Sequence, residues 1–343
     1  MRAQAERLPL LKPHGRGFVR STGMAVPERV VTNDDLARIV DTSDEWIRTR
    51  SGIRERRMCA EGQNTADLAA EAGLKALEEA GVDPLEVEVI ILSTATPDHL
   101  LPATACETQA RMGADRAAGF DISAACAGWI YGLTIADGLL TTGVYQNVLV
   151  IGAEKMSAIL DYTDRTTCVL FGDGAGAALL GPGDDPADGG SGLLATHMQT
   201  DGRQAEILWR PAGGAAMPST LETQAERLEY VKQEGREVFK SAVLAMEESS
   251  RIVLHRAGLT IDEVDWVIPH QANIRIIDAV AKRLNVPMSR VFVNIDRYGN
   301  TSSASIPIAL DEARKQGRTG VGDTILMTAF GGGLAWGAAL LRL

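Results

Sequence analysis

Short runs of apolar residues alternate with helical stretches along this chain, and this alternation constrains the fold more than any other feature. Val87–Thr96 is a nearly continuous run rich in β-branched side chains, which predicts a strand buried on both faces. Just before it, Thr65–Ala80 carries leucine and alanine on one helical face, and Gly81 ends the predicted helix. Strands that alternate with helices predict an α/β protein with mainly parallel sheets.

The same alternation continues to the end of the chain. The other segments with the composition of buried strands are Gly119–Ser123, Val148–Glu154, Val264–Pro269, Asp323–Thr328 and Trp336–Leu343. The other segments with helical periodicity are Ala124–Thr141, Gly235–Ala257 and Ile274–Leu284.

A polar loop rich in glycine, proline and aspartate, Gly181–Gly192, is the best internal boundary. It divides 343 residues, a length that is large for one domain, into nearly equal parts, and we expect two halves at residues 17–183 and 193–343. Each half contains a strand that leads into a helix start of small residues, DISAACAG in the first and IPHQANIR in the second. Taken alone, this is only a weak sign of duplication.

Charge, cysteines and hydropathy limit the class of protein. A net charge of −11 argues against general binding to nucleic acid or to an anionic membrane, so an acidic partner would need a local basic patch. The four cysteines form no C-x-x-C pair and have no histidine nearby, which argues against zinc and indicates reduced thiols in the cytoplasm. Neither residues 1–16 nor any later run has signal-peptide or transmembrane character. We interpret residues 1–16 as a leader or short extension.

The segment Gly119–Thr134, GFDISAACAGWIYGLT, is the most informative about chemistry. Cys126 follows the end of an expected strand and lies among small residues where an apolar helix begins. The helix dipole and free backbone N–H groups favour a thiolate there, and the small neighbours leave room for a substrate carbonyl. The alternative is a buried structural cysteine, and this segment alone does not decide between the two. Cys59, Cys106 and Cys168 lack this context and are expected to be packing residues.

His270 and Asn300 are the other candidates for a polar site. His270 follows Val264–Pro269, at the carboxyl end of an expected strand, where catalytic groups gather in open α/β sheets; its alternative role is structural. Asn300 lies in the polar cluster RYGNTSSAS, and its alternative role is a helix cap or a turn. Gly331–Gly333, after Phe330, either presents a backbone N–H to a ligand or makes a tight turn.

Gly172–Ala177, GDGAGA, matches the dinucleotide fingerprint G-x-G-x-x-A only superficially. A short apolar piece and a Gly/Pro/Asp loop follow it instead of a helix, so we reject this interpretation. The chain also has no Walker A sequence, and phosphate transfer therefore has no support.

Seven segments, taken together and in order, resemble the β-ketoacyl-acyl carrier protein synthase III family of thiolase-like condensing enzymes. They are Thr42–Arg57, Ala124–Gly128, Thr163–Ala177, Gly235–Lys240, Pro269–Ile276, Gly299–Pro307 and Ala329–Gly337. The resemblance runs from about Gly17 to Leu343. It implies a five-layer αβαβα fold made of two similar halves with mixed, mainly parallel sheets, and it implies a homodimer.

The resemblance also implies roles for individual residues. Cys126 would be the nucleophile that takes an acyl group from acyl-CoA, and His270 and Asn300 would hold the malonyl thioester carbonyl during decarboxylation. The backbone N–H groups of Cys126 and Gly332 would form the oxyanion hole. The residues at positions where the family contacts the CoA nucleotide are Trp46, Arg50, Arg165 and Arg275. The residues expected to form a basic patch for the acidic carrier protein are Lys240, Arg275, Lys282 and Arg283.

The acyl pocket is expected to involve Leu101 and Phe330, with Leu101 reaching across the dimer to cap the pocket of the other subunit. The implied reaction converts an acyl-CoA primer and malonyl-acyl carrier protein into 3-oxoacyl-acyl carrier protein, CO2 and CoA, the initiating step of fatty acid biosynthesis. A thiolate attacks a thioester readily. Loss of CO2 then supplies a carbanion without a strong base, and two neutral donors stabilise the developing enolate. No metal or redox cofactor is implied.

Two departures from the family leave details open. Gln233 stands in a polar VKQEG context where relatives often have methionine, which affects the pantetheine tunnel, and Leu101 replaces the bulkier aromatic of some acetyl-specific relatives, which affects the primer. The nearest alternative is a starter-unit condensing or acyl-transfer enzyme of a polyketide or quinolone pathway.

More distant alternatives fit the sequence less well. A thiolase would need a second cysteine in the glycine-rich C-terminal loop. A papain-like protease is disfavoured because Cys126 is mid-chain on an α/β pattern. A non-catalytic binding module would form no acyl adduct.

Overall fold

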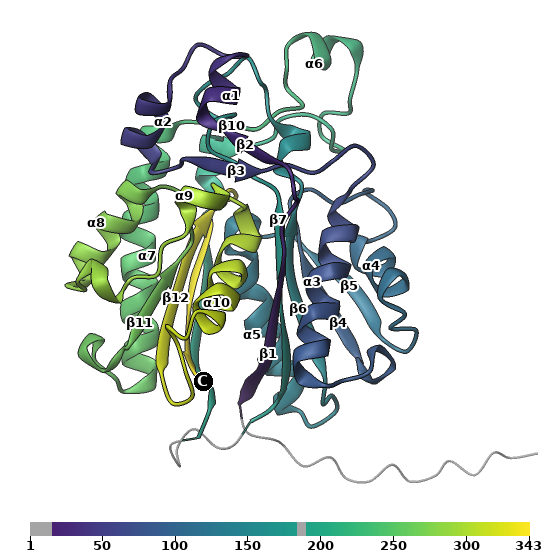
Figure 1. Cartoon of the computed structure of the whole chain (residues 1–343), viewed down its shortest axis with the longest axis vertical. Coiled ribbons are helices and arrows are strands. Elements are labelled where there is room, and N and C mark those ends of the chain that lie inside the picture. The colour runs from purple at the N-terminus through teal and green to yellow at the C-terminus, as the bar shows by residue number, and fades with distance from the viewer. Residues whose placement is uncertain (1–15, 184–189) are drawn as a thin grey trace, which may run out of the picture.

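Two mixed β-sheets face each other across a central layer of helices, and further helices cover the outer face of each sheet (Figure 1). The computed structural model describes residues 16–183 and 190–343. The predicted five-layer αβαβα class is confirmed.

The first sheet has the strand order β1-β7-β6-β4-β5. Its strands are β1 (Gly17–Ala25), β4 (Val89–Ser93), β5 (Ala118–Ile122), β6 (Val148–Glu154) and β7 (Gly174–Pro182). Strands β4, β5 and β6 run parallel, while β7 is antiparallel to both β6 and β1. In the described part of the chain β5 pairs with β4 alone, so one edge of this sheet is open.

The second sheet has the order β11-β12-β13-β8. Its strands are β8 (Gly192–Thr200), β11 (Trp266–Pro269), β12 (Thr324–Gly331) and β13 (Ala335–Arg342). β11 and β12 are parallel, and the other two pairings are antiparallel. The larger helices are α3 (Thr65–Ala80) and α4 (Thr104–Met112) outside the first sheet, α5 (Gly128–Thr141) and α10 (Ser305–Lys315) in the centre, and α7 (Gly235–Ala257) and α8 (Ile274–Leu284) outside the second.

Smaller elements gather at the end of the sheets where β6 and β12 finish (Figure 1). They are β2 (Val30–Thr32), α1 (Asn33–Ala37), α2 (Asp44–Ser51), β3 (Glu55–Arg57), β9 (Leu208–Trp209), α6 (Leu221–Ala225), β10 (Lys232–Gln233) and α9 (Ile295–Tyr298). None of the helices in the described ranges combines the length and apolar composition that a membrane crossing needs.

The two halves repeat one topology. The strand order β1-β7-β6-β4 of the first sheet corresponds to β8-β13-β12-β11 of the second, and a parallel bridge between Val267 and Val291 stands where β4 pairs with β5. In each half a 3₁₀ turn leads into the central helix, η2 (Ala125–Ala127) before α5 and η8 (Ser302–Ala304) before α10. The chain therefore consists of two similar halves.

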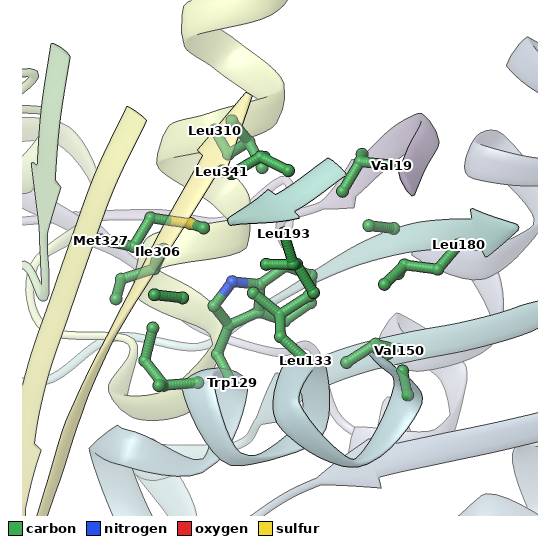
Figure 2. Close-up of a cluster of buried hydrophobic side chains, with 14 of the residues drawn as sticks. Val19, Trp129, Leu133, Val150, Leu180, Leu193, Ile306, Leu310, Met327 and Leu341 are labelled. Atoms are coloured by element: carbon green, nitrogen blue, oxygen red, sulfur yellow. The ribbon is translucent and has the colours of Figure 1, made fainter. Parts of the chain in front are cut away.

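Apolar side chains of α5 fill the space between the sheets. Trp129 and Leu133 are fully buried, and they belong to one cluster with Val150 of the first sheet and Met327 and Leu341 of the second (Figure 2). Each such side chain contributes about 1.5–3 kcal/mol through burial. This packing holds the start of α5, and with it Cys126, between the two sheets.

The predicted elements are present, with α3, α7, α8 and β6 at the predicted bounds and the other strand ends shifted by up to three residues. Strands β1, β7 and β8 and helix α10 were not predicted. β7, GAGAALLGP, is rich in glycine and alanine, which carry little strand signal. It needs them because α10 packs on its backbone: a Cβ on Gly176 would lie 2.6 Å from the nitrogen of Ile308. The rejected dinucleotide segment thus continues into a strand, not a helix.

Candidate active site

Cys126 lies at a sharp turn between the first sheet and the central helix α5. β5 ends at Ile122, and Ala125 has a φ of 45°, a left-handed conformation that residues other than glycine rarely adopt. This turn interrupts the helix that was predicted to begin at Ala124, so Cys126 sits in η2 and α5 begins at Gly128. The side chain of Cys126 is 7% exposed and lines a cavity.

The glycine loop after β12 lies directly against Cys126. A Cβ added to Gly331 would lie 2.5 Å from the backbone nitrogen of Cys126 and 3.0 Å from its Cβ, so no larger residue fits without displacing the turn. The next residue, Gly332, lines the same cavity. The backbone of the glycine loop and the backbone of Cys126 therefore lie side by side, next to the Cys126 sulfur.

The thiol of Cys126 is neutral in the free protein. Burial raises its pKa to about 12, which outweighs the lowering effect of hydrogen bonding between Cys126 and Ser302, whose Sγ and Oγ lie 3.5 Å apart. The negative charge of Glu154 raises this pKa further. The expectation that the helix start favours a thiolate is thus not met, because loss of hydration dominates.

His270 follows the last residue of β11 and is held on both sides. Its backbone N–H donates to Thr328 O at 2.8 Å, and its Nδ1 lies 2.6 Å from Ser305 Oγ. The Gln271 N–H donates to the same Ser305 oxygen at 3.3 Å, and a Ser305 hydroxyl that donates to Nδ1 places the ring proton on Nε2. Burial lowers the pKa of His270 to about 3, so the imidazole is neutral and can donate from Nε2.

Asn300 is fixed in the turn between α9 and η8. Its backbone N–H donates to Leu170 O at 2.8 Å, and its carbonyl accepts from the Gly172 N–H at 3.0 Å. Its side-chain Oδ1 accepts from the Ser302 N–H at 2.8 Å. Because Oδ1 is occupied, Nδ2 is the side-chain group that can donate to a ligand.

One cavity of about 510 Å³ brings these candidates together. Its wall includes Cys126, His270, Asn300, Gly332 and Phe330. They come from separate segments that all end at the same edge of the two sheets, where polar groups collect in α/β proteins. The cavity holds a neutral thiol and two neutral hydrogen-bond donors, a set suited to thioester chemistry. Within residues 16–183 and 190–343 no cluster of His, Cys, Asp and Glu has the arrangement of a metal site.

A second cavity, of about 310 Å³, adjoins the first. Trp46, Arg50 and Arg165 line it, and Gln233 and Gly235 are among the residues that line both cavities. The guanidinium carbons of Arg50 and Arg165 lie 4.5 and 5.1 Å from the centroid of the Trp46 ring.

Arg275, the fourth residue predicted for nucleotide contact, lies on α8 near these three. Its Nη2 donates to Thr49 O of α2 at 2.9 Å, which ties the two helices together. It is exposed and does not belong to the described lining of either cavity.

The remaining predicted cations are exposed on α7 and α8, each beside a carboxylate. Lys240 lies 4.0 Å from Glu237, Lys282 lies 2.5 Å from Asp278, and Arg283 pairs with Glu247. The predicted patch therefore carries less net positive charge than its cations alone suggest.

The two residues predicted for the acyl pocket have different positions. Phe330 is buried, lines the main cavity and stacks on Trp336 with ring centroids 6.4 Å apart. Leu101 is 88% exposed, in the loop before α4, and is not in the described lining of the cavity of its own chain.

Ser302, Ser305 and Glu154 contribute to the site but were not singled out from the sequence. The serines lie in the polar cluster around Asn300, and Glu154 ends the otherwise apolar strand VLVIGAE. A carboxylate that ends a buried apolar strand is the one signal that could have drawn attention to it.

Family models match both halves of the chain. Residues 120–202 match the model described as 3-Oxoacyl-[acyl-carrier-protein (ACP)] synthase III, and residues 254–343 match the model of the C terminal of the same family. A curated relative from Roseiflexus castenholzii, named Beta-ketoacyl-[acyl-carrier-protein] synthase III, is 54% identical over 320 residues, 93% of this chain and 96% of its own.

Solved structures give the same result for the fold. The 3-oxoacyl-[acyl-carrier-protein] synthase III from Aquifex aeolicus is 50% identical with a TM-score of 0.87, covering 95% of this chain and 100% of its own. The priming β-ketosynthase from the R1128 polyketide biosynthetic pathway is 36% identical with a TM-score of 0.88, covering 98% of each chain.

Proposed function

The chain belongs to the 3-oxoacyl-[acyl-carrier-protein] synthase III family, and from this premise we propose that Cys126, His270 and Asn300 carry out its decarboxylative condensation. The enzyme is an acyltransferase that joins an acyl-CoA primer to malonyl-acyl carrier protein and releases CO2 and CoA. The observation that carries the assignment is that these three side chains, from three distant segments, line one cavity.

The reaction has two half-reactions. Cys126 Sγ attacks the thioester of the primer and forms an acyl-enzyme, while the N–H groups of Cys126 and Gly332 stabilise the oxyanion. Malonyl-carrier protein then enters, and His270 Nε2 and Asn300 Nδ2 donate to its thioester oxygen as CO2 leaves. The resulting carbanion attacks the acyl group and frees the cysteine. The decisive experiment is intact-mass detection of an acyl adduct with a panel of acyl-CoAs, followed by CO2 release on addition of malonyl-carrier protein.

The second cavity is proposed to hold the nucleotide of CoA. The ring of Trp46 and the guanidinium groups of Arg50 and Arg165 offer stacking and charge for an adenine and its phosphates. The residues shared by both cavities then form the passage for pantetheine toward Cys126, with Gln233 at its wall. Arg275 is proposed to contact CoA or the carrier protein from α8.

We propose that the protein is a homodimer formed across the open edge of β5. That edge has unpaired backbone groups, and the neighbouring loop exposes Leu100 and Leu101 by 85% and 88%, which is costly for a monomer. Leu101 would then reach the acyl cavity of the second copy. Sedimentation velocity at micromolar concentration tests the dimer.

Primer choice gives a prediction for Leu101. Leucine is smaller than phenylalanine, so we expect the wild type to accept primers longer or more branched than acetyl, and Leu101→Phe to narrow use toward acetyl-CoA. A buried methylene contributes about 0.8 kcal/mol, so two or three of them shift kcat/KM ratios by roughly one to two orders of magnitude. The measurement is kcat/KM for acetyl-, butyryl- and isobutyryl-CoA. Leu100→Phe is the matched control, and a wild type confined to acetyl-CoA with Leu101→Phe identical to it would contradict the assignment.

Carrier-protein docking gives a prediction for Lys240. An enzyme of net charge −11 needs local positive charge to meet an acidic carrier, and Lys240 is exposed with its nearest carboxylate at 4.0 Å. We expect Lys240→Glu to raise KM for malonyl-carrier protein about fivefold at low salt, since a reversed rim charge costs about 1 kcal/mol, and the effect should shrink as salt is added. Steady-state kinetics with Lys75→Glu, a reversal on α3 far from this patch, is the control. An unchanged KM at low salt would remove Lys240 from the interface.

The halves are proposed to divide at residues 17–183 and 193–343, and the repeated strand order supports this division. The enzyme is proposed to act in the cytoplasm. It is proposed to initiate fatty acid biosynthesis, because the 3-oxoacyl-[acyl-carrier-protein] synthase III relatives are more similar to this chain than the polyketide ketosynthase is. A starter-unit role in a polyketide or quinolone pathway is separated from it by the products formed with the primer panel.

A further inference from the structure

A fully buried carboxylate lies directly behind the site, and none of the steps above uses it. Glu154 is the last residue of β6 and is 0% exposed. No lysine or arginine of the described residues pairs with it; its neighbour Lys155 instead donates from Nζ to Asn64 Oδ1 at 3.0 Å. A buried carboxylate without a cation is costly, and such a group calls for an explanation.

Hydroxyl and backbone donors from two segments surround this carboxylate. Oε2 accepts from the Ala95 N–H at 3.0 Å and the Thr96 hydroxyl at 2.9 Å, with the Thr94 hydroxyl at 3.3 Å. Oε1 accepts from the hydroxyls of Ser302 at 3.0 Å and Ser303 at 2.7 Å, with the Ser303 N–H at 3.4 Å. These groups are placed to donate, an environment that stabilises the ionised carboxylate. Burial nevertheless raises the pKa of Glu154 against these hydrogen bonds, so it is disposed to take up a proton.

Ser302 joins this carboxylate to the nucleophile. Its hydroxyl proton goes to Glu154, which leaves its oxygen to accept the thiol proton of Cys126 at 3.5 Å. The two hydrogen bonds therefore run in the same direction: the Cys126 thiol donates to Ser302, and Ser302 donates to Glu154. With its proton directed to Ser302, the sulfur has its lone pairs free for an acyl group in the cavity.

Acyl transfer requires that the thiol lose its proton, and the division of roles above assigns no group to receive it. His270 and Asn300 are proposed as donors to the malonyl oxygen, and a thiol with a pKa near 12 does not ionise on its own at neutral pH. We propose that Glu154, acting through Ser302, receives the thiol proton of Cys126 during acyl transfer. This inference rests on the assignment of Cys126 as the nucleophile.

The step balances in atoms and charge. As the bond between Cys126 Sγ and the acyl carbon forms, the thiol proton moves to Ser302 Oγ and the Ser302 proton moves to Glu154 Oε1. The bond between the acyl carbon and the CoA sulfur then breaks; the Ser302 hydroxyl gives its proton to the CoA thiolate, and Glu154 returns its proton to Ser302. The products are acyl-Cys126, CoA as the thiol and an ionised Glu154.

The titratable groups around the Cys126 sulfur allow the pH dependence of acylation to be interpreted. Glu154 lies behind it and His270 lines the same cavity; the neighbours of Glu154 from the 93–96 segment and from η8 are serine and threonine residues and Ala95. His270 has a pKa of about 3 and stays neutral throughout the useful range. The pH dependence of acylation therefore reports on the thiol and its acceptor.

The test is the single-turnover rate of acyl-enzyme formation, followed by rapid quench and intact mass, in wild type, Ser302→Ala and Glu154→Gln. Either variant removes the acceptor path, so we expect acylation near neutral pH to fall about 100-fold, the lower end for loss of a proton acceptor. Only free thiolate then reacts, so log rate in the variants should rise with pH at a slope near one from about pH 6 to 9, while the wild type is nearly flat. Alanine is tolerated in the Ser302 conformation, φ 50°, since Ala125 has φ 45° at the equivalent turn.

Ser303→Ala is the matched control, because Ser303 donates to the same oxygen of Glu154, whereas the hydrogen bond of the Cys126 thiol goes to Ser302. It should retain acylation within a few-fold. The proton path through Ser302 would be overturned by a wild-type acylation rate in Ser302→Ala. It would also be overturned by an acylation rate that is lost in either variant and does not rise again with pH. If Glu154→Gln does not fold, Ser302→Ala alone decides the question. Absence of any adduct in the wild type would instead overturn the nucleophile assignment.

Discussion

We expect Cys126→Ser to stop acyl transfer from acyl-CoA, with a loss on the order of 10⁶-fold, the size seen when a covalent nucleophile is removed. A serine hydroxyl is far less acidic and less nucleophilic than a thiol, and the His270 imidazole, whose Nδ1 is engaged by Ser305 and whose Nε2 carries the ring proton, has no free nitrogen to deprotonate it. The substitution changes one atom in a packed turn, so the fold should be retained. The measurement is intact mass after incubation with acyl-CoA.

Two other cysteines provide controls for this experiment. Cys168 is fully buried with a pKa raised by burial to about 11, and Cys106 is exposed on α4. Cys168→Ser and Cys106→Ser should therefore form the adduct at the wild-type rate. If Cys126→Ser still acquires a labile acyl group while folded by circular dichroism and thermal melting, another residue is the nucleophile.

The sequence was sufficient for elements whose local signals agree with their tertiary setting. α3 has an alanine and leucine face, a capping box at Asn64 and a left-handed Gly81, and its predicted bounds are those observed. β7 and α10 were missed for the opposite reason. The glycines of β7 are required by the close approach of α10, a contact between distant segments that no local window contains.

The sequence indicated where some residues of the candidate site lie, but it did not indicate Ser302, Ser305 or Glu154, nor the electrostatics of the site. Local context placed Cys126 and His270 at element boundaries, and these boundaries do meet in one cavity. The helix-start argument for a thiolate failed because burial depends on the whole fold. The link from Cys126 through Ser302 to Glu154 joins positions 176 and 148 residues apart, and no spacing rule covers such distances.

The second large effect separates the half-reactions. We expect His270→Ala and Asn300→Ala to form the acyl-enzyme but to release CO2 from malonyl-carrier protein about 10²–10³-fold more slowly, the usual cost of losing one donor to a developing oxyanion. The two donors act on the same oxygen, so the double variant should lose less than the product of the single losses. The measurements are adduct formation by mass and single-turnover CO2 release from pre-acylated enzyme.

The protonation state of His270 adds a pH test with a definite sign. An ordinary imidazole with a pKa of 6.5 gains a proton as pH falls through that value, whereas burial holds His270 near 3 and keeps it neutral. CO2 release by pre-acylated wild type should therefore not change through a histidine titration between about pH 5 and 8. His270→Ala is the cleaner variant, because Asn300 Oδ1 also holds the Ser302 N–H and its loss disturbs the thiol acceptor. Equal and severe loss of acylation and CO2 release in His270→Ala would mean that His270 serves the thiol directly, and the separation of roles argued above would fail.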